Sequence, residues 1–383
     1  MRRVIAILLA VVLLGGVGWF VWRQLRPAAV EVHGVAGSEK LPFLRDERVV
    51  ARFRELGYEL VVEAVGSRQI ATHPRLREVD FAFPSSETAA ARVQQELETT
   101  EQWLPFDSPM VVLSWQPVVD ALTAEGLVET DAGGAQVLDM AALFELLGED
   151  ARWDGLREPV PELARGQIMV RTTDVRTSNS AAMYLALAGY LGNGETPVAA
   201  SDVDDELMEP LAELFLDQGE LASSSEYLFE NYAARGVSYS PMVFTYESHF
   251  VDEAMRADTR VREGMAVMYP SPSVVSGHVV VPVPGSETGS EVGRLLTEDP
   301  ELQRLAAEYG FRPREAPDAF AEVVAGLDQP ARQEIADVIG APTYESLERM
   351  IQWIEDEYQD SGMAAPAPAD PGADIAPRSG EGA

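Results

Sequence analysis

Three segments in the first part of the chain repeat one order: a short apolar strand, a polar turn and then a helical pattern. The predicted strands cover residues 30–35, 60–65 and 79–83. The turns after them read Gly37-Ser38-Glu39-Lys40, Gly66-Ser67-Arg68 and Pro84-Ser85-Ser86. This alternation predicts an α/β layer with a mostly parallel sheet, whose ligands gather at the carboxyl ends of the strands. The polar turns are therefore candidate binding elements.

Residues 167–191 contain a further segment of this kind. The apolar run 168–170 predicts a short buried strand, a turn rich in hydroxyl and amide groups covers 172–180, and an apolar helix begins at Ala181. Ser178, Asn179 and Ser180 stand where N-cap residues occur. Free backbone N–H groups and the helix dipole at such a turn favour a small anion or a carboxylate. The alternative, that these residues only cap a buried helix, stays open.

The composition excludes some classes of protein. The 383 residues leave room for two domains, and 63 acidic against 29 basic residues give a net charge of −34. No basic stripe is left to bind nucleic acid. Cysteine is absent, which excludes disulfides and thiolate metal sites, and the four histidines show no metal-ligand spacing. We expect neither a metal nor another cofactor.

No catalytic motif stands out. The sequence lacks a Gly-x-Ser-x-Gly elbow, a phosphate-binding Gly-x4-Gly-Lys loop and a His-Glu-x-x-His helix. Pairs of carboxylates arise by chance in so acidic a chain and therefore carry no weight. We expect a protein that is not an enzyme.

The N-terminal segment predicts a membrane anchor. Residues 4–22 carry no charge, are long enough to cross a hydrocarbon core of about 30 Å, and end in Trp19, Phe20 and Trp22. A cleaved signal peptide is the alternative, but its apolar core is usually shorter and ends at small residues. We expect a single-pass protein of the cell membrane whose main body is extracytoplasmic.

The rest of the chain continues as strands and helices up to Pro313. Strands are predicted at 109–115, 241–246, 265–269 and 278–283, with acidic helical regions at 203–234 and 289–310. Beyond Pro313, apolar residues that include Phe320, Ile335, Ile339 and Leu347 predict two or three amphipathic helices. From Ser361 onward a Pro/Ala/Gly-rich tail predicts disorder.

This layout resembles the bacterial extracellular solute-binding proteins of the type II periplasmic-binding fold, as used by ABC transporters. The resemblance covers about residues 30–313. It rests on the early Gly-Ser-Glu-Lys loop, an Asp-Phe-Ala-Phe-Pro strand end, the crossing strand 109–115 and the Thr-Ser-Asn-Ser turn. It continues with a return strand that ends in Tyr246-Glu247 and a closing segment that contains Tyr309-Gly310-Phe311-Arg312.

The resemblance implies two α/β lobes with a ligand in the cleft between them. The first lobe would comprise residues 30–108 and 245–313, and the second residues 109–244. An anchor and linker (1–29), a C-terminal helical appendix (314–360) and a disordered tail (361–383) would complete the chain. Ligand contacts carried over from the family fall on the strand-end turns, at Ser38, Glu39, Gly66, Ser67, Arg68, Ser85, Thr177, Ser178, Asn179, Ser180 and Tyr246.

Two functions follow as expectations. In the first, an anchored solute-binding protein captures a small anionic or carboxylate-bearing ligand for a membrane transporter, and Arg68 is the sharpest candidate because guanidinium binds such groups in a fork. In the second, an anchored sensing module keeps the fold, and its C-terminal helices dock a partner within the membrane complex. Arg68 in a surface salt bridge is the structural alternative to its ligand role.

Overall fold

The computed structural model describes residues 29–362, apart from 150, 220 and 328. The predicted anchor at 4–22 and the tail at 363–383 lie outside these residues. Within the described part, no helix has both the length and the apolar character needed to cross a membrane.

The first lobe is built on a parallel sheet, as the repeated strand–turn–helix order predicts. Strand β1 (Val30–Ala36) pairs in parallel with β2 (Tyr58–Ala64) and with β3 (Phe81–Phe83), and β9 (Val275–Pro282) lies antiparallel to β3. Successive residues of β1 face opposite sides of the sheet. Val32 packs in the core with α3 (Glu47–Glu55), α11 (Glu287–Glu298) and α12 (Pro300–Glu308), and Val35 packs in the core with α4 (Glu87–Leu97).

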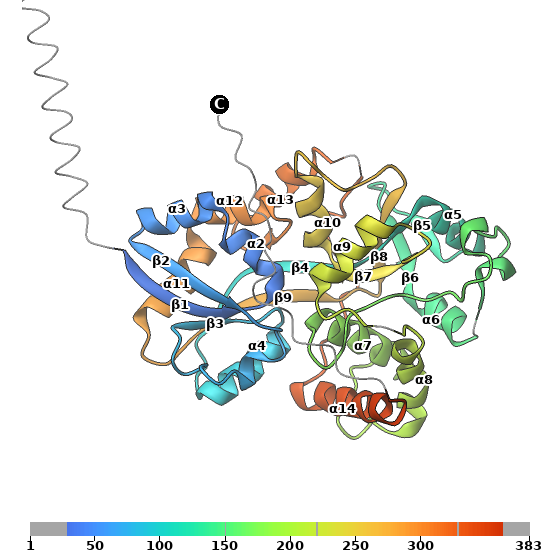
Figure 1. The fold of residues 1–383 in the computed structure, drawn as a ribbon, viewed down its shortest axis with the longest axis horizontal. Coiled ribbons are helices and arrows are strands. Elements are labelled where there is room, and N and C mark those ends of the chain that lie inside the picture. The colour runs from blue at the N-terminus through green and yellow to red at the C-terminus, as the bar shows by residue number, and fades with distance from the viewer. Residues whose placement is uncertain (1–28, 150, 220, 328, 363–383) are drawn as a thin grey trace, which may run out of the picture.

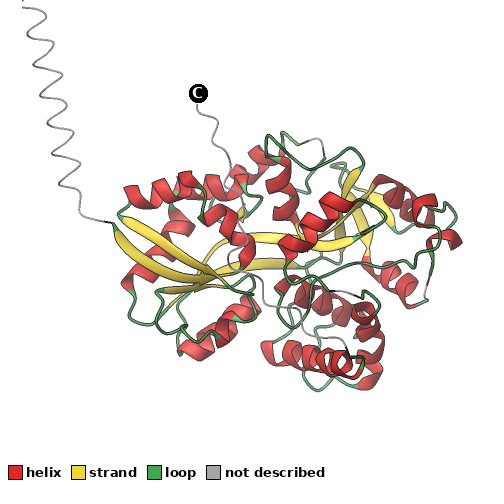
Figure 2. Ribbon diagram, in the orientation of Figure 1, coloured by secondary structure: helices red, strands yellow, loops and turns green. Residues whose placement is uncertain are grey.

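Strand β4 (Trp103–Trp115) joins the two lobes. Its first half pairs with β9, while its second half pairs with β7 (Val243–Tyr246) and β8 (Met265–Ser271), all antiparallel. The sheet therefore runs on from one lobe into the other, as the strands in Figure 2 show. The strand is longer than the predicted 109–115 and begins at Trp103, and the short β10 (Arg312–Pro313) pairs with its first half.

The second lobe surrounds α7 (Asn179–Gly192), which is buried from Asn179 to Gly189. A helix that is apolar all round is stable only inside a core, and α7 fits this rule. Figure 1 shows α8 and α14 beside α7, with α5, α6 and strands β5 and β6 at the far end of the lobe. The elements named here are α5 (Gln116–Glu125), β5 (Val128–Thr130), β6 (Gln136–Asp139), α6 (Met140–Gly148), α8 (Asp205–Leu216) and α14 (Tyr344–Asp360). The fold also contains α2 (Leu41–Leu44), α9 (Ser225–Arg235) and α10 (Glu247–Ala254).

The boundaries between the lobes remain a proposal. The pairing of the strands indicates where the chain passes from one lobe to the other. Strand β8 pairs with the second half of β4 and with β6, which places residues 265–271 beside the second lobe. Residues 275–282 then return to the first lobe as β9. We therefore propose a second crossing between β8 and β9, in addition to β4.

The C-terminal appendix packs against the lobes. Helix α13 (Pro317–Val324) buries Phe320 against Val251 and Ala307, and α14 (Tyr344–Asp360) buries Leu347 and Ile354 in the core of the second lobe. Two of the predicted two or three helices are thus present, and the segment around Ile335 and Ile339 does not form a third. That segment has no regular helix; its backbone bonds to Ser273, and Asp337 has a positive φ of 53°.

Two other local predictions also fail. Ile168 and Val170 are buried as predicted, but the segment forms no regular strand: its neighbours Gln167, Arg171 and Thr173 make only isolated bridges, each to a different partner. The turn at 66–68 opens a single 3-10 turn (Ile70–Thr72) and no full helix. Pro74 follows at once, and a proline disfavours helical backbone in the residue before it.

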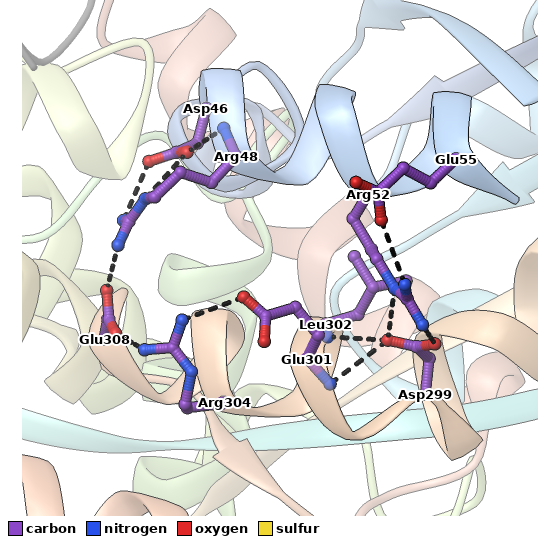
Figure 3. A network of polar contacts seen from close by, with 9 residues as sticks. All are labelled: Asp46, Arg48, Arg52, Glu55, Asp299, Glu301, Leu302, Arg304 and Glu308. Carbon is purple, nitrogen blue, oxygen red and sulfur yellow. Dashed lines mark hydrogen bonds and ion pairs between the residues drawn. The ribbon is translucent and has the colours of Figure 1, made fainter. Parts of the chain in front are cut away.

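A network of ion pairs with partly exposed arginines links α3 to α12 on the surface of the first lobe (Figure 3). Arg48 donates to Asp46 and to Glu308 (2.5 Å), and Arg52 donates to Asp299 (2.6 Å). Asp46 and Asp299 also accept backbone N–H groups, from Arg48 in the first turn of α3 and from Leu302 in the first turn of α12. We call this set the α3–α12 network.

Candidate binding site between the lobes

The first-lobe half of the site is a buried polar cluster at the ends of β1 and β3. The Glu39 carboxylate accepts from the Lys40 ammonium and from the Ser85 hydroxyl, and Lys40 Nζ also lies 2.9 Å from Ser85 Oγ. Ser67, in the loop after β2, hydrogen-bonds Ser85 through its hydroxyl. The polar turns of three strands thus meet at one point, as the sequence predicts. We call Glu39, Lys40, Ser67, Ser85 and His278 the cleft cluster.

Gly37 allows these groups to come together. A Cβ atom at this position would lie 2.5 Å from both Ser67 Oγ and Ser85 Oγ and 2.6 Å from Glu39 Oε2. Any side chain would therefore push the cluster apart. The glycine places the backbone of the turn directly against the polar groups, a use of glycine that close packing of backbone requires.

Burial and charge set the ionisation of the cluster. Burial opposes the charge of Glu39, but the Lys40 ammonium beside it prevails and lowers the pKa of the carboxyl to about 2. Burial holds the pKa of the His278 ring well below its usual value, so the ring is neutral, and its Nδ1 lies 3.3 Å from Lys40 Nζ. Burial also lowers the pKa of Lys40, against the opposing effect of Glu39. The cluster therefore holds one ion pair with no net charge.

The second-lobe half consists of the start of α7 and the end of β7. Asn179 Nδ2 donates to the Ser85 carbonyl at 3.2 Å and lies 3.1 Å from Tyr246 OH and 3.2 Å from Ser276 Oγ. Asn179 is only 4% exposed. Its amide thus joins the second lobe to the strand ends of the first.

The other residues of the Thr-Ser-Asn-Ser turn lie at the lobe contact or behind it. A Cβ atom on Gly66 would lie 2.8 Å from the Thr177 carbonyl oxygen, so the two lobes touch there. Ser178 occupies the N-cap position, but its side chain does not cap α7 and instead lies 3.1 Å from Ser180 Oγ. Ser180 also bonds Thr173, and Ser38 is partly exposed at the start of its turn.

Arg68 lies at the lobe interface, but its guanidinium is directed at the appendix. Its Nη2 donates to Glu348 of α14 at 2.6 Å, and the Arg68 side chain is 11% exposed. Arg176 likewise binds Asp174 within its own turn. The structure thus favours the salt-bridge interpretation of Arg68 and gives the residue a role in tying α14 to the first lobe.

A small cavity adjoins Glu39 between the lobes. Its volume is about 20 Å³, and its lining includes Tyr309, Glu226 and His249. This is room for about one water molecule. Burial raises the pKa of the Glu226 carboxyl to about 7, with the nearby Glu230 adding to the shift, and burial lowers the pKa of His249 to about 4. A solute larger than a water molecule needs either lobe movement or a displaced side chain.

Sequence reasoning missed Lys40, Ser276 and His278 as site residues. Lys40 is the only lysine in the sequence, and it is fully buried, which is rare for this residue type. The presence of a single lysine in the whole sequence was the feature that could have identified it as a site residue. Ser276 and His278 lie on β9, which returns to the first lobe late in the chain, and nothing local distinguishes them from ordinary strand residues.

Comparisons with known proteins bear on the fold. No protein-family model matches the sequence, and no curated protein matches it either. Solved structures do match. The periplasmic binding protein AfuA of Actinobacillus pleuropneumoniae, with fructose-6-phosphate bound, has a TM-score of 0.56 and 10% identity, over 88% of this chain and 100% of that one.

Two further structures agree. The sulfate-binding protein SubI of Mycobacterium tuberculosis has a TM-score of 0.51 and 16% identity, over 79% of this chain and 93% of that one. The apo ferric ion-binding protein A of Pasteurella haemolytica has a TM-score of 0.52 and 10% identity, over 88% and 98%. This chain therefore has the two-lobed type II periplasmic solute-binding fold. At these identities the likeness establishes the fold alone.

Proposed function

We propose that this protein is an extracytoplasmic solute-binding protein that holds a small ligand between its lobes for a membrane transporter. The observation that carries the proposal is the convergence at Asn179. One amide from the second lobe reaches the Ser85 carbonyl of the first, beside the hydroxyls of Tyr246 and Ser276. Strand ends of both lobes thus supply buried hydrogen-bonding groups to one place, which is how solute sites in open α/β sheets are formed.

The chemistry of the cluster supports an anionic or carboxylate-bearing ligand. The serine hydroxyls and the Asn179 amide donate hydrogen bonds, and Lys40 is the buried cation beside them. The Glu39 carboxylate already accepts from Lys40 and Ser85, so these donors suit a carboxylate or an oxyanion. Ser67, Ser85, Asn179 and Tyr246 are the proposed contacts, with Ser38, Gly66 and the turn 177–180 forming the surrounding frame.

We propose further that residues 4–22 stay attached as the membrane anchor, which would place the body on the outer face of the membrane. The length of the apolar run and its bulky aromatic end support this proposal. Sequencing the N-terminus of the mature protein checks it, and a start near Ala29 or Val30 would contradict it. The sensing alternative has no comparable support, because the apolar face of α14 packs into the protein's own core.

The experiment uses the full chain purified in detergent. Native mass spectrometry detects small molecules that co-purify, and calorimetry then measures the binding of sulfate and inorganic phosphate. Asn179→Ala removes neutral hydrogen bonds worth about 1 kcal/mol, so we expect binding to weaken roughly fivefold.

Asn193→Ala is the matched control. Asn193 caps the other end of α7 and bonds to Thr196, away from the strand ends. We expect this variant to bind like the wild type. If Asn179→Ala binds the ligand as tightly as the wild type, the ligand does not bind at the lobe interface. If no ligand co-purifies and neither anion binds, the proposed function is wrong.

A further inference from the structure

We infer that the Glu39 carboxylate occupies the anion position of the solute site, as a ligand tethered to the chain that an incoming oxyanion or carboxylate must displace. This inference rests on the proposed function and names the residue that sets its affinity. It adds to the proposed function that Glu39 competes with the solute for the same hydrogen-bond donors and does not bind the solute.

The first support is the set of partners around the carboxylate. Glu39 Oε1 accepts from the Lys40 ammonium and the Ser85 hydroxyl and lies 3.6 Å from His278 Nδ1. These groups come from separate elements, namely the turn after β1, the end of β3 and β9. Lys40 and Ser85 donate to the anionic oxygen as they would donate to a bound anion, whereas the neutral His278 ring faces Lys40 Nζ. The Glu39 side chain is 5% exposed.

The second support is the lack of space for both groups. The cavity next to Glu39 has a volume of about 20 Å³, enough for about one water molecule. A sulfate or a carboxylate group with its substituent does not fit there while Glu39 holds its place. Glu39 lines this cavity, so the free space borders the residue that an incoming solute would displace.

The third support is the charge balance. Lys40 has no other carboxylate partner among the ion pairs of the described residues, so a displaced Glu39 leaves a buried ammonium that favours a replacement anion. A solute that brings its own negative charge restores the pair. A neutral solute cannot restore the pair. Glu39 would therefore make the site selective for negatively charged solutes.

The test compares sulfate and acetate binding by calorimetry in the full chain and two variants. Glu39→Ala removes the tethered carboxylate and opens its space, and we expect both anions to bind at least tenfold more tightly than to the wild type. Glu39→Gln keeps the volume and one acceptor but loses the charge. It guards against a folding defect in the alanine variant, and we expect a smaller tightening in the same direction.

Glu253→Gln is the matched control. Glu253 is another buried carboxylate that lines the same cavity, but it pairs with Arg260. Its removal reduces the negative charge of the protein by the same amount, and we expect no tightening. Equal tightening in Glu39→Gln and Glu253→Gln would show a general charge effect and overturn the inference.

The outcomes separate the inference from the proposed function. If the wild type binds an anion and neither Glu39 variant binds it more tightly, the inference is wrong and the proposed function stands. If neither the wild type nor the variants bind any anion, both are wrong. Tighter binding in both Glu39 variants together with unchanged binding in Glu253→Gln supports the inference.

Discussion

The cleft cluster and the α3–α12 network both contain ion pairs, but the cations of these pairs lie in opposite surroundings. In the network of Figure 3, the Arg48 side chain is 45% exposed and that of Arg304 is 49% exposed. In the cleft cluster, Lys40 is fully buried and Glu39 is 5% exposed. The carboxylates Asp46 and Asp299 are nearly as buried as Glu39, so the regions differ in their cations: water reaches the arginines of the network but not Lys40.

This difference decides what each region contributes. Exposed ion pairs typically contribute between about 0.2 and 1 kcal/mol, because water screens them. Removing one partner of a buried pair costs about 3–5 kcal/mol, since the other charge stays buried without compensation. The network is a property of the surface, whereas the cleft cluster keeps a costly charge pair at the point where the lobes meet.

The largest expected effect is that of Lys40→Met. The substitution leaves the Glu39 carboxylate buried without its cation, so we expect the free energy of unfolding to fall by about 3–5 kcal/mol. Urea denaturation followed by circular dichroism measures this change.

The double variant Glu39→Gln/Lys40→Met provides the control for this prediction. It removes both charges, so we expect it to be clearly more stable than Lys40→Met alone. A loss below about 1 kcal/mol for Lys40→Met would show that the cleft pair behaves like a surface pair, and the contrast between the two regions would disappear.

The smallest expected effect is that of Arg304→Gln in the network. Arg304 pairs with Glu301 and Glu308 on its own helix, so we expect a loss of less than about 1 kcal/mol that shrinks as salt is added. The same denaturation experiment at low and high sodium chloride measures it. A loss as large as that of Lys40→Met would mean that burial does not separate the regions.

The sequence predicted those parts of the molecule that depend on local pattern. The parallel first-lobe strands and the burial of α7 follow from strand–turn–helix order and from uninterrupted apolar runs. The meeting of Ser67 and Ser85 also follows, since strand ends share one edge of a sheet. The approach of Asn179 and Tyr246 from the other side was implied by the family resemblance alone. Local pattern thus predicted the first-lobe half of the candidate site.

Partners that are distant in the sequence limited the prediction. Arg68 pairs with Glu348, which lies 280 residues later on a helix outside the resemblance. The extent of β4 depends on β9 and β10, although Pro105 and Pro109 would argue locally against a long strand. The orientation of Glu39 toward Lys40 and Ser85 depends on Gly37 and on packing of the whole lobe.

Crystallography with selenate tests the central claim most directly. Selenate has the shape and charge of sulfate, and the anomalous scattering of selenium marks its position in crystals of the wild type and of Glu39→Ala. We predict a peak in Glu39→Ala within hydrogen-bond reach of Ser85 Oγ and Lys40 Nζ, between the two lobes, and a weaker one in the wild type. A peak only elsewhere on the protein, or none in either crystal, would contradict the account of an anion site at the strand ends.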